Sequence, residues 1–150
     1  NFTAVGAVAM FGGLYLPRRL AIIAPLAAMF VSDIFIGFYN WPILFAVYAG
    51  FVLMCLIGYY TRGHKSITSI FIGTVSGSVL FYLVTNWAVW AFGSMYPHSF
   101  AGLFESYYMA LPFFRNSLLG DIFFVGALVA TFEAARAIVK FASPRVVDSV

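Results

Sequence analysis

Residues 86–121 read NWAVWAFGSMYPHSFAGLFESYYMALPFFRNSLLGD and stand out from a chain that is otherwise rich in apolar runs. The segment combines tryptophan and tyrosine rings with ionisable and amide side chains. Such rings concentrate where a membrane meets water, and ionisable groups near membrane depth are costly and therefore candidates for function. We expect the segment to form the rim of a binding site, with candidate residues Asn86, Trp87, Trp90, Tyr96, His98, Glu105, Arg115, Asn116 and Asp121.

The composition predicts an integral membrane protein of one domain. Of the 150 residues, 63% are hydrophobic and only 9% are charged, which a water-exposed surface of this size would not tolerate. The net charge is +3, but the basic residues form short clusters between apolar runs, so they indicate membrane topology rather than a nucleic-acid surface. Because the sequence starts at Asn1 without methionine, we expect a processed or fragmentary start.

Five apolar runs favour an all-α fold, a polytopic bundle of transmembrane helices. A bilayer core of about 30 Å requires about 20 helical residues. The first run is shorter than this, and Pro25 predicts a kink in the second. Residues 86–116 are expected to form an interfacial helix and loop on the outer face. The sequence thus predicts about five spans, or six if a helix precedes Asn1, over residues 2–16, 20–38, 43–60, 67–84 and 117–141.

The basic residues predict the orientation of these spans, because lysine and arginine accumulate on the cytoplasmic side. A sixth crossing by residues 101–114 would move the last basic residues outside. That segment is also short, contains Glu105 and ends at Leu111-Pro112, so five crossings are preferred. We expect a bacterial inner membrane, or an organelle membrane if the start is processed, with Arg115 outside. The basic residues expected inside are Arg18, Arg19, Arg62, Lys65, Arg136, Lys140 and Arg145.

Polar residues from separate segments meet on the predicted outer face. Asp33, Asn40 and Trp41 join residues 86–121 there. Aromatic rings with a few hydrogen-bonding groups are typical of small-molecule sites. These three residues therefore complete the predicted substrate-binding set.

Each candidate also has a structural interpretation. Asp33 and Asp121 either bind a ligand or pair with Arg115, the one positive charge predicted on that face. His98 is either a solvated interfacial residue or a ligand contact. The three tryptophans are either interfacial belt residues or stack on a ligand. Asn86 either caps its helix or reaches the ligand.

The sequence does not favour catalysis or a resident cofactor. It has no nucleophile beside a base, no closely spaced pair of carboxylates and no glycine-rich phosphate loop, so we do not expect an enzyme. Cys55 lies in an apolar run and is interpreted as a small buried residue. His64 and His98 fall on opposite predicted faces, so no metal site is expected. Glu133 and Arg136 are expected to pair locally.

Several short motifs mark this chain, namely NFTAVGAVAMFGG (1–13), PLAA (25–28) with Ser32-Asp33, Thr85-Asn86 with Trp90, Tyr96-Pro97-His98, and LPFFRN (111–116) with Gly120-Asp121. They resemble the motifs of an uncharacterised family of small prokaryotic membrane proteins. The helix pattern of that family is similar to the S components of energy-coupling-factor vitamin transporters, the solitary cobalamin-type ones among them.

The resemblance to S components implies six helices with both termini inside and a vitamin bound from outside in three loops. With a helix before Asn1, those loops correspond to residues 1–3, 39–42 and 86–116. The first helix of S components carries the small-residue contact to the transporter's membrane module and lies outside this sequence, so Ala24 and Ala28 do not inherit that contact. Cys55 lies mid-helix, so a cobalt-ligating role is not carried over.

Two functions follow from the sequence. The first is a substrate-binding integral membrane transport component for a small vitamin-like solute, captured from the outer face and served by an ATPase or transmembrane transporter module. The second is an accessory, non-catalytic subunit of a photosynthetic or respiratory membrane complex, packing against partner helices, lipid or pigments. Both place the chain in the lipid bilayer, and neither involves nucleic acid.

Overall fold

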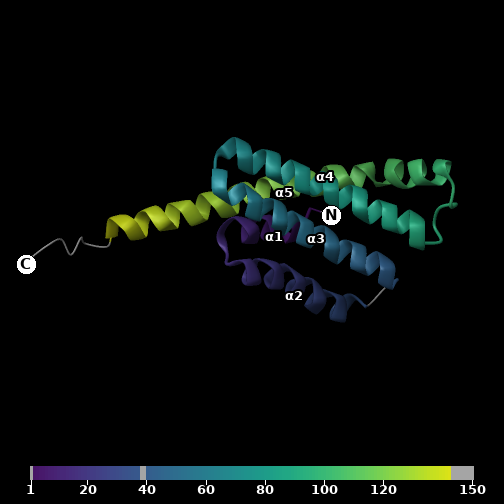
Figure 1. Ribbon diagram of the computed structural model, residues 1–150, viewed down its shortest axis with the longest axis horizontal. Helices are drawn as coiled ribbons and strands as arrows, with labels where there is room; N and C mark the ends of the chain where they lie inside the picture. The colour runs from purple at the N-terminus through teal and green to yellow at the C-terminus, as the bar shows by residue number, and fades with distance from the viewer. Residues whose placement is uncertain (1, 38–39, 143–150) are drawn as a thin grey trace, which may run out of the picture.

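The computed structural model describes residues 2–37 and 40–142, and every element of regular secondary structure in this part of the chain is a helix (Figure 1). Three residues to which the sequence analysis assigns a place lie outside the described residues: Asn1 and Tyr39, in the predicted outer loops, and Arg145, on the predicted inner face. The elements are α1 (Val5–Tyr15), α2 (Arg18–Ile36), α3 (Trp41–Thr61), the short 3-10 helix η1 (Arg62–His64), α4 (Ile67–Phe92) and α5 (Phe100–Ala142).

The described residues confirm the all-α class, and three segments are long and apolar enough to cross a membrane, which supports a lipid environment. They are Trp41–His64, Ile67–Phe92 and Phe100–Phe141. α1, with 11 residues, is about 16 Å long and is much shorter than the bilayer core of about 30 Å. The number of crossings, five in the sequence analysis, stays a prediction.

Residues 86–116 do not form a separate interfacial helix and loop, so that prediction is wrong. α4 continues to Phe92, and α5 begins at Phe100 and runs without interruption past Pro112 to Ala142. A proline removes one backbone hydrogen bond, but an apolar helix that is packed against a neighbour tolerates the loss. Here α4 packs along the first part of α5 and provides that support.

α1 is the buried centre of the bundle and packs against α2, α3 and α5. Its closest approach is to α3, where Gly13 and Gly58 face each other. A Cβ atom added at Gly13 would collide with the backbone carbonyl of Cys55, and one at Gly58 would collide with the carbonyl of Met10. Small residues at such positions let two helix backbones touch, which is the usual basis of helix association in membranes.

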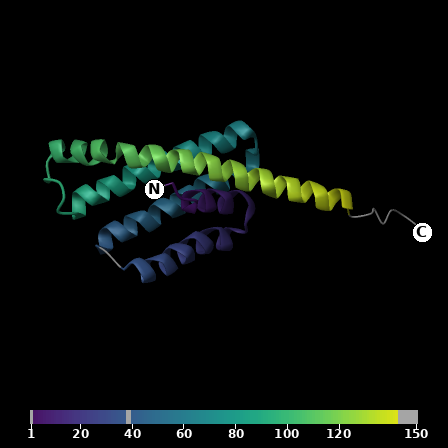
Figure 2. The ribbon, with the colours of Figure 1, turned by 180° about the vertical axis from the view of Figure 1, so that it is seen from behind.

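The connections between helices gather at two ends of the bundle. In both views the end of α2, the start of α3 and the α4–α5 connection lie at one end, while the α1–α2 connection and η1 lie at the other (Figures 1 and 2). The amide of Asn40 donates to the carbonyl of Phe92 at 2.9 Å and joins the start of α3 to the end of α4. Arg18 and Arg62 therefore share the opposite end, from which α5 projects, and the compartment that this end faces stays a prediction.

Arg62 fastens the end of α1 at this basic end of the bundle. Its guanidinium donates to the carbonyl of Gly13, at 2.7 and 3.1 Å, and also to the carbonyl of Leu16. The last carbonyls of a helix have no partners within the helix, and a cation there also complements the helix dipole. Arg62 thus ties α1 to the segment that follows α3.

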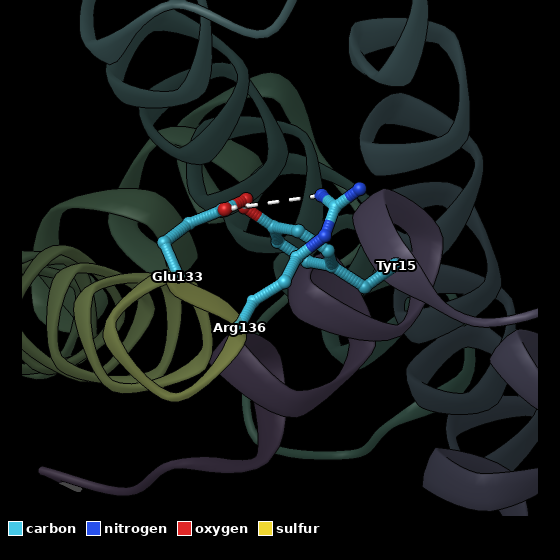
Figure 3. A network of polar contacts seen from close by, with 3 residues as sticks. All are labelled: Tyr15, Glu133 and Arg136. Atoms are coloured by element: carbon cyan, nitrogen blue, oxygen red, sulfur yellow. Dashed lines mark hydrogen bonds and ion pairs between the residues drawn. The ribbon is translucent and has the colours of Figure 1, made fainter. Parts of the chain in front are cut away.

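A polar cluster at the same end ties α5 to α1 (Figure 3). Tyr15 donates to Glu133 at 2.7 Å, and Glu133 lies 3.8 Å from Arg136, which confirms the predicted local pair. The ammonium of Lys65 lies 3.9 Å from the centre of the Tyr15 ring. Burial lowers the pKa of Lys65 below its ordinary value, while the negative charge of Glu133 acts in the opposite direction.

Candidate functional site

The polar cavity of the bundle lies between α4 and α5 and has a volume of about 360 Å³. We name it the α4–α5 cavity. Aromatic rings form much of its wall, and hydroxyl, amide and carboxylate groups provide its polar atoms. Its lining residues are Ser78, Phe81, Tyr82, Thr85, Asn86, Ala110, Phe113, Phe114, Ser117 and Asp121.

The carboxylate of this cavity belongs to Asp121 of α5, a buried residue that is only 7% exposed. The hydroxyl of Ser78 on α4 donates to its Oδ2 atom at 2.7 Å, and the backbone amide of Ala7 also hydrogen-bonds the carboxylate. Ala4, at the start of α1, offers no side-chain cap. The carboxylate of Asp121 therefore caps α1 from another helix, and the favourable helix dipole explains how the charge is accommodated there.

A second cavity of about 210 Å³ adjoins the first one at Asp121. Both cavities share Phe81, Ser117 and Asp121, and the second one extends to Thr3 and Gly6 beside α1. A Cβ atom at Gly6 would collide with the carboxylate, so the glycine is what permits this close approach. Asp121 thus lies where the two hollow regions meet.

The cavity wall on α4 is a continuous face of the helix. Ser78, Tyr82 and Asn86 follow one another at four-residue spacing, so their side chains project on the same side. The amide of Asn86 donates to the carbonyl of Tyr82 at 2.8 Å, and Thr85 donates to that of Phe81 at the same distance. Among these residues, Tyr82 also contacts α5.

Tyr82 connects the two helices in two ways. Its hydroxyl donates to the carbonyl of Tyr107 at 2.6 Å, and its ring centre lies 4.6 Å from that of Phe114. Tyr107 in turn donates to the carbonyl of Leu83 at 3.0 Å. These reciprocal bonds hold α4 and α5 at a fixed separation and give the cavity a rigid wall.

Arg115 does not neutralise either buried carboxylate, so the proposed pairing is wrong. Arg115 is exposed, and in the described part of the chain no ion pair joins it to Asp33 or Asp121. Asp33, 4% exposed, instead accepts a hydrogen bond from Tyr48 at 2.7 Å between α2 and α3, outside the cavity. Within residues 2–37 and 40–142, no three His, Cys, Asp or Glu side chains are grouped to hold a metal ion.

The aromatic candidates of the α4–α5 connection hold that connection together. The indole of Trp90 donates to the carbonyl of Pro97 at 3.1 Å, and the His98 ring lies 3.3 Å from the carbonyl of Gly93. The rings of Trp90 and His98 meet edge to face, with centres 6.1 Å apart. These contacts account for both residues without a ligand.

Of the twelve predicted site residues, only Asn86 and Asp121 line the α4–α5 cavity. Trp87 packs edge-on against Phe92 near the end of α4, and the Asn40 amide donates a hydrogen bond to the carbonyl of Phe92. The residues that the structure places away from the cavity are Asp33, Asn40, Trp41, Trp87, Trp90, Tyr96, His98, Glu105, Arg115 and Asn116.

A family model described as "Family of unknown function (DUF6580)" matches residues 1–144. The chain belongs to this family. No curated protein and no solved structure matches the chain. Membership supports the resemblance to an uncharacterised family, and the further likeness to S components of vitamin transporters stays a prediction.

In this member of the DUF6580 family, three polar cavity residues were not singled out from the sequence. They are Ser78, Tyr82 and Ser117. The available signal was the spacing of Ser78, Tyr82 and Asn86, which places polar groups on one face of an apolar helix. Such residues can hydrogen-bond a neighbouring helix, as Tyr82 does here.

Proposed function

We propose that this chain is the substrate-binding component of a membrane transporter and takes a small vitamin-like solute into the α4–α5 cavity. The observation that carries the proposal is a cavity of about 360 Å³ with an aromatic wall and a buried carboxylate. Sites for small molecules are concave, mostly apolar and about 300–1,000 Å³ in volume, with a few polar groups that fix the ligand.

The position of the cavity along α4 supports capture from the end opposite the basic loops. Its wall extends from Ser78 to Asn86, about 12 Å along the helix, and Asn86 lies less than two turns from Phe92 at the α4–α5 end. By the bias of basic residues toward the cytoplasm, that end faces outside. In this proposal the helices form five crossings, and a transporter or ATPase module supplied by other chains moves the solute.

A second candidate function, an accessory subunit of a larger membrane complex, has its own observation. An apolar groove of about 420 Å³ lies between α4 and α5 nearer the basic end, and it includes Ile67, Phe71 and Val129. Ile67 is 90% exposed and Phe71 is 53% exposed. Helices, lipid or pigments of a larger complex would cover such a surface.

Native mass spectrometry of the full chain, released from a mild detergent, tests the proposal. We expect a co-purifying small molecule of defined mass on the wild-type protein. Asn86→Ala should lose this mass, because Asn86 lines the cavity. Asn116→Ala should retain it, because Asn116 is exposed on α5 and lies outside the cavity. Companion protein subunits with no small molecule would favour the accessory role and contradict the transport role.

A further inference from the structure

Asp121 is a buried carboxylate without a basic partner. It lies at the junction of the two cavities, and no lysine, arginine or histidine of the described ranges lines either one. A carboxylate in a low-dielectric interior is costly unless a positive charge or several hydrogen bonds compensate it. The donors that the structure provides, Ser78 and the amide of Ala7, contribute partial charges only.

Two hydroxyl groups of the α4–α5 cavity have already used their donors within the bundle. Thr85 donates to Phe81, and Tyr82 donates to Tyr107. One N–H of the Asn86 amide donates to the carbonyl of Tyr82, whereas among the described residues its side-chain carbonyl oxygen has no donor. The acceptors of the cavity that remain open to a ligand are this oxygen and the carboxylate of Asp121. A ligand that fits them must donate hydrogen bonds or carry positive charge.

The aromatic wall has the same preference. Phe81, Tyr82, Phe113 and Phe114 line the cavity that contains the carboxylate. The faces of aromatic rings carry partial negative charge and attract cations, more strongly when water is excluded. An anion would meet the negative carboxylate with no positive side chain among the lining residues to offset the repulsion.

We propose that the solute bound in the α4–α5 cavity is an organic cation, an ammonium or a cationic heterocycle on a flat apolar body, with its charge beside Asp121. This inference rests on the proposed function and specifies its ligand class. The apolar body packs on the aromatic wall, and the carbonyl oxygen of Asn86 accepts a hydrogen bond from the ligand.

The test compares benzylammonium with benzyl alcohol, which has a similar shape and no charge, on the purified full chain. Binding is measured by isothermal titration or by the rise in melting temperature in mild detergent. The informative variant is Asp121→Asn, which keeps the shape and an acceptor for the amide of Ala7. Asp33→Asn is the matched control, because Asp33 is a buried carboxylate outside both cavities.

We expect benzylammonium to bind the wild-type chain at least about tenfold more tightly than benzyl alcohol. Asp121→Asn should abolish this preference, and Asp33→Asn should retain it. Equal affinity for the two probes in the wild-type chain, or a preference that survives in Asp121→Asn, would overturn the inference. Stabilisation by sodium chloride equal to that by benzylammonium, at the same ionic strength, would also overturn the organic-cation assignment.

The same samples separate this inference from the proposed function. If native mass spectrometry finds a neutral or anionic solute that Asn86→Ala removes, the solute-binding role stands and the cation assignment fails. If no probe binds and no small molecule co-purifies, both fail together.

Discussion

The hydroxyl of Ser78 on α4 lies 2.7 Å from Oδ2 of Asp121 on α5 and donates a hydrogen bond to it. The same carboxylate hydrogen-bonds the backbone amide of Ala7 on α1. Three helices thus meet at one acidic side chain that also lines two cavities. The stability of the bundle and the chemistry of the candidate site therefore depend on the same residue.

Ser78→Ala should lower the free energy of unfolding by about 2 kcal/mol, because a buried hydrogen bond to a charged group is lost. The measurement is a denaturant titration in mild detergent. Ser76→Ala is the control, since Ser76 lies on the exposed side of the same helix and should change stability by less than about 0.5 kcal/mol. Equal effects of the two variants would show that the bond to Asp121 contributes nothing.

Gly58→Ala should destabilise the bundle by more than about 2 kcal/mol, because the new Cβ atom would collide with the backbone carbonyl of Met10 and push α1 away from α3. Gly126→Ala is the control. A Cβ atom at Gly126 meets nothing within 4 Å, so alanine there should be neutral or stabilise the helix by up to about 1 kcal/mol. If Gly58→Ala melts like the wild type, the close packing of α1 on α3 is not required.

Arg62→Ala should release the end of α1, since the guanidinium is the partner of the carbonyls of Gly13 and Leu16. We expect a loss of about 2 kcal/mol in the free energy of unfolding. Amide hydrogen exchange should also rise in α1 more than in α4. Arg19→Ala, an exposed arginine at the same end, should leave both quantities unchanged. Matching losses in the two variants would mean that net charge, and not capping, matters at this end.

The helical class was predictable because hydrophobic runs of about 20 residues report a membrane environment directly. The predicted runs at 43–60 and 67–84 correspond to α3 and α4, although α4 extends to Phe92. The error at residues 86–116 has a physical cause. Pro112 and the polar residues around it indicate a break locally, but packing against α4, including the contact of Tyr82 with Phe114, supports a continuous helix.

The sequence predicted only those residues of the candidate site that stand out individually, as polar residues beside an apolar run. Asn86 and Asp121 are polar groups at the ends of apolar runs, and both line the cavity. The partners of Asp121 come from α1 and α4, far away in the sequence, so no local pattern identifies them. The pair Glu133 and Arg136 was predictable because residues three apart on a helix are neighbours.

Arg115→Ala should change the free energy of unfolding by less than about 0.5 kcal/mol and leave the benzylammonium affinity unchanged. The reason is that Arg115 is exposed and contacts neither Asp33 nor Asp121 in the described part of the chain. Asp121→Asn, measured in parallel, should lose the charge preference. A loss of affinity in Arg115→Ala comparable to that in Asp121→Asn would place Arg115 in the site and contradict the geometry.

Glu133→Gln should lower the pKa of Lys65 further below its ordinary value. Burial already lowers this pKa, and the negative charge of Glu133 partly restores it by stabilising the ammonium. Removing that charge leaves burial and the repulsion from Arg62 and Arg136 without opposition. The pKa is measured by the pH dependence of the lysine side-chain NMR signals. The chain has two lysines, so Lys140→Arg identifies the resonance of Lys65.

Arg136→Gln is the matched control for Glu133→Gln, because the two charges act on Lys65 with opposite signs. The positive charge of Arg136 lowers the pKa of Lys65, so its removal should raise that pKa. A general effect of loosening the end of α5 would move the pKa in the same direction in both variants. Opposite shifts would therefore show that Lys65 senses the individual charges of α5, and that the polar cluster around Tyr15 is assembled in the membrane-bound protein (Figure 3).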